Sequence, residues 1–419
     1  MDNTTESHHF TDALKVNDIR LFIAAMGAFT LGSRALAVVI GFQIYRLTHS
    51  AMALGWLGLV EAIPAISLVL VGGYVADHFS RKAILLITRA SACLCALMLI
   101  WLSLKQGAAP LLELYGVIFL AGIARGFTDP ANTAFEAQVV PRHLTVSASA
   151  WISSVWIAAS VIGPAAIGFA FDSWGAAGSY TAITACFILS WLFTLAIAPK
   201  PRPRPLTQVP LLKSIGLGWD FILGHQPLLY AMALDLLAVL FGGAVALLPI
   251  FADDILHVGA KGLGLLNAAP SLGAVLITLI ATRHSPMGRA GRNLLLTVAG
   301  FGISILCFAF SKNFWLSMGF LFLSGVFDGI NMVIRRSMVR LLSPDELRGR
   351  IAAANSIFIC ASNELGALES GMLASLIGTV PCVALGGILT LVVVGAVAGL
   401  APQLRKLRFG TKDLRPNAG

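Results

Sequence analysis

The residues of this chain best placed to do chemistry are charged side chains that interrupt long apolar segments. A charge at the centre of a membrane-spanning helix costs about 2.5–3.5 kcal/mol even on insertion scales, so each one needs a partner or a wet cavity. Such side chains can bind an ionic solute, carry a proton or form a structural ion pair. They are Arg34, Glu61, Arg125, Asp129, Glu136, Asp235, Asp328, Arg335, Glu364 and Glu369.

Arg125 and Asp129 are four residues apart, which places them on one face of a helix, where they can neutralise each other. Two interpretations remain open. In the first, protonation of Asp129 frees Arg125 for an anionic substrate and couples proton entry to substrate exit. In the second, the pair is structural and holds its helix against a neighbour.

The other charged residues differ in what their positions predict. Glu364 and Glu369 are five residues apart and therefore point about 140° from each other on a helix, so they do not both face one site. Glu136 and Arg335 fall near the ends of their segments, where we expect the side chains to snorkel to the surface.

The sequence lacks the motifs of energy-coupling or catalytic modules. It has no Gly-Lys dipeptide and hence no phosphate-binding loop, and it has no H-E-x-x-H motif. The six cysteines lie in apolar segments and form no C-x-x-C motif. We therefore predict a protein that is not an enzyme, without catalytic residues, a metal site or a cofactor.

The composition indicates which solvent surrounds the chain. Of the 419 residues 57% are hydrophobic and only 12% are charged, and the mean hydropathy is +0.85. A lipid bilayer accommodates such a composition, and only helices satisfy their own backbone within single apolar segments. We predict an all-α membrane protein with twelve transmembrane helices near residues 21–45, 57–76, 84–104, 111–123, 151–171, 181–198, 228–252, 262–282, 292–311, 314–341, 351–376 and 380–401.

The basic residues predict the orientation in the membrane. The formal net charge is +9, and most Lys and Arg residues fall in loops on one side, whereas the opposite loops hold only Arg46, Lys105, Lys261 and Lys312. The positive-inside rule places both termini in the cytoplasm, in a bacterial inner membrane. Membrane lipids are the partners that such loops require, and nucleic acid is not expected.

The chain divides at a proline-rich stretch, 199–205, which cannot continue a helix through lipid. We predict a tail (1–18), a six-helix bundle (19–198), a cytoplasmic linker (199–227), a second six-helix bundle (228–401) and a second tail (402–419). The two bundles have similar sequences: 58–64 aligns with 264–270, 206 residues later, and Gly126 and Gly163 align with Gly329 and Gly366, 203 residues later. Such a duplication predicts a cavity between two pseudo-symmetric halves near the bilayer midplane.

The turn after the second predicted span, Gly73-Tyr-Val-Ala-Asp-His-Phe-Ser-Arg-Lys82, resembles the G-x-x-x-D-[RK]-x-G-R-[RK] signature of the major facilitator superfamily. The sequence departs from it at His78 and Ser80. The resemblance implies the two-bundle fold and a gating latch formed by Gly73, Asp77, Arg81 and Lys82. Physically, we expect Gly73 to allow close helix packing, Asp77 to accept from backbone amides at a helix start, and the basic pair to anchor the membrane surface.

Two further stretches, 344–350 (Pro-Asp-Glu-Leu-Arg-Gly-Arg) and 362–370, resemble the branch of this superfamily that contains the enterobactin exporter and macrolide efflux pumps. Residues 343–346 also read as a capped helix start. In the superfamily the first, fourth, seventh and tenth helices line the cavity. The resemblance therefore makes Arg34, Arg125, Asp129, Asp235 and Asp328 the leading candidates for substrate binding or proton coupling, with Glu61 and Glu364 beside them.

Together these features predict a monomeric secondary transporter that exports a small organic molecule by alternating access, in exchange for protons. A siderophore is the predicted substrate class, because acidic ligands suit Arg34 and Arg125. The alternatives are a broad-specificity drug efflux pump, a lysophospholipid flippase and, from another class, a receptor or scaffold that does not transport. Asp328 aligns with Arg125 in the duplication, so these opposite charges are predicted to meet across the cavity in one state.

Overall fold

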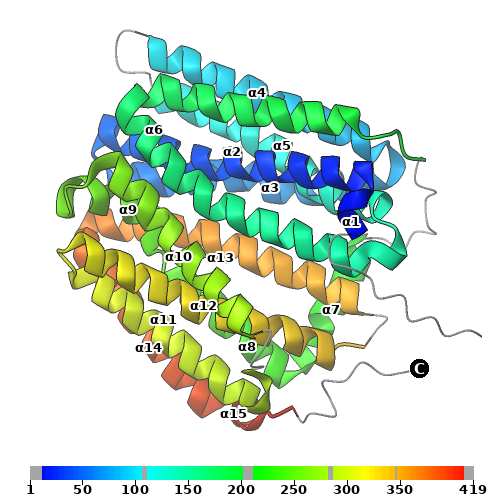
Figure 1. Ribbon diagram of the computed structural model, residues 1–419. Coiled ribbons are helices and arrows are strands. Elements are labelled where there is room, and N and C mark those ends of the chain that lie inside the picture. The colour runs from blue at the N-terminus through cyan, green and yellow to red at the C-terminus, as the bar shows by residue number, and fades with distance from the viewer. Residues whose placement is uncertain (1–11, 106–110, 202–210, 282–285, 345–346, 410–419) are drawn as a thin grey trace, which may run out of the picture. The chain divides into compact units, whose positions relative to one another are not determined.

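The computed structural model describes residues 12–105, 111–201, 211–281, 286–344 and 347–409, and within these ranges the chain is helical without a strand (Figure 1). The elements up to residue 201 are α1 (Asp12–Lys15), α2 (Asn17–Thr48), α3 (Ala51–His78), α4 (Arg81–Leu104), α5 (Leu111–Val139), η1 (Arg142–Leu144) and α6 (Thr145–Ala196). Those that follow are α7 (Leu211–Gly224), α8 (Gln226–Phe241), η2 (Ala244–Leu247), α9 (Leu248–Ile250), η3 (Phe251–Ile255), α10 (Gly259–Ala281), η4 (Pro286–Arg289), α11 (Ala290–Phe310), α12 (Phe314–Leu342), α13 (Arg348–Ile377), α14 (Thr379–Leu400) and α15 (Pro402–Lys406).

Ten segments of the described chain are long and apolar enough to cross a membrane. One of them, α6, contains both the fifth and the sixth predicted spans. Its helical conformation breaks at Gly175, whose φ of +66° is open to glycine at no steric cost. The seventh predicted span is likewise interrupted, by η2 and α9 after Gly242.

Two compact units make up the chain. Unit 1 comprises residues 1–43 and 63–206, and unit 2 comprises residues 44–62 and 207–419. The boundary at 206/207 falls inside the predicted linker. That linker contains the 14-residue helix α7, and its residues 202–210 lie outside the described chain.

In unit 1, α4 packs against both α5 and α6 (Figure 1). The apolar core lies where these helices meet the start of α2, around Phe22, Leu85 and Phe135. The rings of Phe22 and Phe135 meet edge to face, with centroids 5.9 Å apart. Asp18 binds Lys200 at 2.6 Å, so the start of α2 holds the chain that follows α6.

In unit 2, α12 packs against α10 and α11, and α8 packs against α13 and α14 (Figure 1). The core gathers Leu228, Leu294, Met338 and Leu404, each of them completely buried. Leu404 belongs to α15, so part of the predicted C-terminal tail is an ordered helix whose apolar residue completes this core.

The duplication seen in the sequence is repeated in the packing of each unit. A Cβ built on Gly163 would come within 2.8 Å of the Leu31 carbonyl oxygen, and one on Gly366 within 2.8 Å of the Leu240 carbonyl oxygen. In both units a glycine of the fifth helix of the bundle therefore lets the backbone of the first helix approach closely. Pro64 and Pro270, which align in the duplication, both lie inside helices, α3 and α10.

Helix caps follow the sequence at some ends and not at others. Asn313 caps α12 by accepting from the amides of Trp315 and Leu316. Ser343, predicted to start a helix, is instead the residue that ends α12, and α13 begins only at Arg348. The Pro344 carbonyl accepts from the Leu347 amide at 3.0 Å, and the acidic residues at 345 and 346 lie outside the described chain.

Candidate functional site

A cluster of buried charged and polar residues lies in unit 2 between α8 and α12. Arg335 Nη1 lies 2.8 Å from Asp235 Oδ2, and the two side chains are only 9% and 5% exposed. The Asn331 amide donates to Asp235 Oδ1 at 2.6 Å. Both oxygens of the Asp235 carboxylate therefore have partners, which a buried charge requires.

Asp328 joins this cluster from the same face of α12. Asp328, Asn331 and Arg335 follow one another at spacings of three and four residues, which aligns them along one side of a helix. Asp328, Asn331 and Asp235 line a cavity of about 10 Å³, just large enough for one water molecule. The other side chains lining the cavity are Ala238, Val239, Thr297, Val298, Phe301 and Phe327.

The charges of the cluster define its chemistry. Two carboxyl groups and one guanidinium leave one negative charge when both acids are ionised, and a single bound proton makes the cluster neutral. Asn331 Oδ1 is buried without a hydrogen-bond partner among the described residues and is available to a water molecule or a protonated carboxyl. This is an arrangement that can hold and release a proton away from bulk water.

Arg335 corrects one sequence-based interpretation. We expected its side chain to snorkel to the membrane surface, but it is buried and pairs with Asp235. Asn331 was not singled out from the sequence at all. The signal was present in the spacing of Asp328, Asn331 and Arg335, which forms a polar stripe along an otherwise apolar helix.

The pair predicted from the four-residue spacing also forms, but in a different environment. Arg125 Nε lies 3.9 Å from Asp129 Oδ2 in α5, and the side chains are 43% and 70% exposed. This pair is therefore exposed on unit 1, whereas Asp235 and Arg335 are buried in unit 2. Arg34 is also exposed, and its guanidinium lies over the ring of Trp156, 5.5 Å from the centroid.

The candidate acids of α3 and α13 both lie in unit 2. The Glu364 carboxylate packs against Gly58, where a built Cβ would come within 3.1 Å of Glu364 Oε2. Glu61 lies one turn further along α3 and is half-buried. Glu369 is half-buried as well and contacts the hydroxyl of Ser370 at 3.4 Å.

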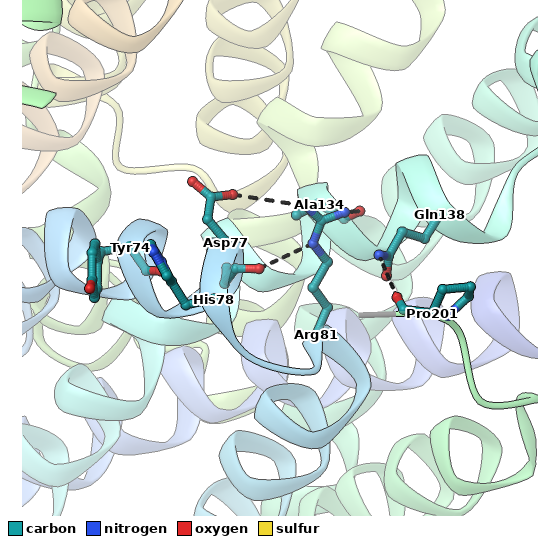
Figure 2. Close-up of polar contacts among 8 residues, drawn as sticks. Tyr74, Asp77, His78, Arg81, Ala134, Gln138 and Pro201 are labelled. Carbon is teal, nitrogen blue, oxygen red and sulfur yellow. Dashed lines mark hydrogen bonds and ion pairs between the residues drawn. The ribbon is translucent and has the colours of Figure 1, made fainter. Parts of the chain in front are cut away.

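Figure 2 shows how the residues of the signature turn lie in unit 1. Arg81 donates through Nη1 to the Ala134 carbonyl at 2.9 Å and through Nε to the Ala76 carbonyl at 3.2 Å, so it ties the end of α3 to α5. Its Nη2 is 3.9 Å from Asp77, whose side chain is 68% exposed. Lys82 donates to the carbonyls of Leu195 and Ile197, which end α6.

Two details of this turn differ from the sequence-based expectation. Close packing falls at Gly72, where a Cβ would lie 2.3 Å from the Gly126 carbonyl oxygen, whereas a Cβ at Gly73 would meet nothing within 4 Å. The residue that caps α4 is Ser80, which accepts from the Ala83 amide at a φ of −62°. Because that φ suits any residue, the serine that replaces the signature glycine does not disturb the turn.

The structure adds charged and polar residues that the sequence analysis did not select. Arg89 in α4 is 1% exposed and donates to the Ser190 carbonyl at 3.2 Å. In unit 2 the Tyr45 hydroxyl donates to the Asp254 carboxylate, and Arg46 pairs with Asp253 at 3.2 Å. The two aspartates lie in η3, a π-helical segment, and their adjacency was the only sequence signal for this contact.

Paired charges inside membrane-spanning helices are typical of pumps, channels and transporters, and repeated helical bundles are typical of secondary transporters. The model of the family described as transmembrane secretion effector matches residues 14–417. The chain therefore belongs to this family of the major facilitator superfamily, and it is a multi-pass inner-membrane secondary transporter of small molecules.

Curated relatives cover most of the chain. It is 26% identical over 375 residues to the enterobactin exporter EntS of Shigella flexneri and 27% identical over 379 residues to that of Escherichia coli O139:H28, with 89% of each chain covered in both comparisons. Among solved structures, the POT family transporter PepTSo matches with a TM-score of 0.76 at 12% identity, covering 93% of this chain and 98% of that one. The nucleoside transporter NupG matches with a TM-score of 0.72 at 13% identity over 92% and 99% of the chains. These structural matches confirm the predicted all-α major facilitator fold.

Proposed function

We propose that this protein exports an acidic small molecule of the siderophore class in exchange for protons, with both termini in the cytoplasm and as a monomer. The observation that supports proton exchange is the buried cluster of Asp235, Asp328 and Arg335, which one proton neutralises. The similarity to relatives that are named as enterobactin exporters supports both the proposed direction of transport and the proposed substrate class.

In this mechanism the proton binds the cluster in one state of the transporter and leaves it in the other. Protonation of one acid removes its charge and weakens its attraction to Arg335. If the strength of that attraction differs between the two states of the transporter, proton release is coupled to the conformational change. Arg34 and Arg125, both exposed on unit 1, are the proposed contacts for the acidic substrate. Asp129 competes with the substrate for Arg125.

The role of the signature turn as a gating latch is part of the same proposal. Arg81 and Lys82 are bound to carbonyl groups within unit 1, while the carboxylate of Asp77 is largely exposed. We assign Arg81 and Lys82 to holding the turn in shape and Asp77 to the latch itself. Gly73, which has open space at its Cβ position, provides clearance beside the latch.

The test uses membrane vesicles that contain the full chain and a catechol siderophore as the probe. When a pH gradient is imposed, wild-type protein should move the siderophore in the direction opposite to the proton flow, and without a gradient it should still exchange labelled for unlabelled siderophore. Asp235→Asn and Asp328→Asn should lose the gradient-driven movement and keep the exchange. Glu113→Gln is the matched control, because this exposed carboxylate pairs with Lys105 away from the cluster.

The outcomes separate the alternatives. Gradient-driven transport that survives in both aspartate variants would exclude the cluster as the proton site. Siderophore transport that is absent while common drugs or lysophospholipids move would replace the proposed substrate with those classes. A protein that moves none of these would support the receptor or scaffold interpretation.

A further inference from the structure

Five cationic side chains gather around one cavity where the C-terminal segment folds back onto the start of α11. The cavity measures about 290 Å³ and is lined by Arg289, Arg292, Arg405, Lys406, Leu407 and Arg408. No acidic side chain of the described chain lines it. All of these residues belong to unit 2.

Specific contacts hold the C-terminal segment in this position. The Gly291 amide donates to the Leu407 carbonyl at 3.3 Å, and the Phe409 amide donates to the Met287 carbonyl at 3.4 Å. Leu404 is fully buried in the core of unit 2, with Leu407 packed against it. A Cβ on Gly291 would lie 1.6 Å from the Leu404 carbonyl oxygen, so only glycine permits this approach.

This packing forces like charges together. Arg289 immediately precedes α11 and Arg292 lies in its first turn, and the anchored segment brings Arg405, Lys406 and Arg408 beside them. Such an assembly repels itself, and the positive end of the α11 dipole adds to the repulsion. The buried leucine contacts offset this repulsion in the folded protein. An anion placed among the five cations would remove the repulsion and stabilise the fold.

The cavity lies at the ends of two segments that are long and apolar enough to cross a membrane, where lipid headgroups are expected. Arg289 and Arg292 are at the beginning of the membrane segment Pro286–Phe310, and α15 directly follows the membrane segment Thr379–Leu400. A phosphate group fits the guanidinium donors, which can each present two parallel N–H groups to its oxygens. Basic pockets of this kind at the ends of transmembrane helices suit the phosphates of anionic lipids.

We propose that this cavity is a binding site for a phosphate group, carried by an anionic phospholipid headgroup or by soluble phosphate. The site is independent of the proposed transport function. It would be present whichever solute the protein carries, because none of its residues belongs to the buried acid cluster or to the latch.

Thermal unfolding of the full-length protein in an uncharged detergent tests the site. Added phosphatidylglycerol should raise the unfolding temperature of the wild type by about 4 °C, while phosphatidylcholine should leave it unchanged. Arg289→Gln/Arg405→Gln should lose at least half of that shift. Without lipid, this variant should be as stable as the wild type or more stable, because part of the repulsion is gone. Lys15→Gln/Arg20→Gln, which removes two exposed charges at the end of α1 and the start of α2, should keep the full shift.

A separate arm identifies the source of the phosphate. If inorganic phosphate produces the shift as well as the lipid does, the site takes soluble phosphate; if only phosphatidylglycerol acts, it takes the headgroup. An equal lipid shift in Arg289→Gln/Arg405→Gln and the wild type would overturn the proposal. Should that variant fold poorly, the number of phosphatidylglycerol molecules retained by Arg408→Gln in native mass spectrometry decides the question: retention equal to the wild type overturns it, and loss of one molecule supports it.

Discussion

Arg335 on α12 pairs with Asp235 on α8 at 2.8 Å, and both side chains are more than 90% buried. The pair joins two helices whose sequences, taken separately, gave no reason to associate these residues. Its burial makes each charge dependent on the other, because neither can turn to water when its partner is removed.

Substitution of one partner should therefore lower the free energy of unfolding more than substitution of both. Arg335→Gln leaves the Asp235 carboxylate buried beside a single amide donor, and we expect a loss of about 3–5 kcal/mol in the free energy of unfolding. Asp235→Asn/Arg335→Gln should recover at least half of that loss. Thermal unfolding of the purified proteins measures both, and equal losses in the single and double variants would contradict the dependence.

Substitutions of Asp77 and Arg81 should have different effects, one mainly on transport and the other mainly on stability. Arg81→Ala removes donors to two carbonyl groups, and we expect unit 1 to lose about 1–3 kcal/mol of stability. Asp77→Asn alters a largely exposed side chain and should change the stability by less than about 0.5 kcal/mol while it reduces transport. Normal transport by a stable Asp77→Asn protein would remove Asp77 from the latch.

The two adjacent glycines of the turn offer a direct test of the packing. Gly72→Ala places a methyl group 2.3 Å from the Gly126 carbonyl oxygen, so α3 and α5 must separate, at a cost of about 1–3 kcal/mol. Gly73→Ala is the matched control and should be tolerated, because nothing lies within 4 Å of its Cβ position. A Gly73→Ala protein that unfolds earlier than Gly72→Ala would show that the close approach lies elsewhere.

Charge reversal separates the two interpretations of the pair in α5. Arg125→Asp/Asp129→Arg keeps an ion pair at the same spacing, so the stability should stay within about 0.5 kcal/mol of the wild type. If Arg125 contacts an acidic substrate, as proposed, the reversed protein should lose siderophore transport. Full transport by the reversed protein would favour a purely structural pair.

The sequence by itself determined the solvent, the helical class, the duplication and the family of this protein. These properties are local or statistical: apolar segments long enough for a bilayer must be helical, and aligned motifs such as 58–64 and 264–270 survive without knowledge of how helices rotate. The signature turn was also readable, since its donors and acceptors lie within a few residues of one another or at neighbouring helix ends.

Only the tertiary structure decided which charges meet. Asp235 and Arg335 are a hundred residues apart, and the rotation of α8 and α12 about their axes sets whether their side chains face each other, lipid or water. In the same way, the orientation of α5 leaves Arg125 and Asp129 exposed, although their spacing suits an ion pair. The basic cavity likewise depends on a backbone contact at Gly291, which no pattern in the basic residues themselves contains. Spacing along one helix fixes a shared face, but the environment of that face is a property of its neighbours.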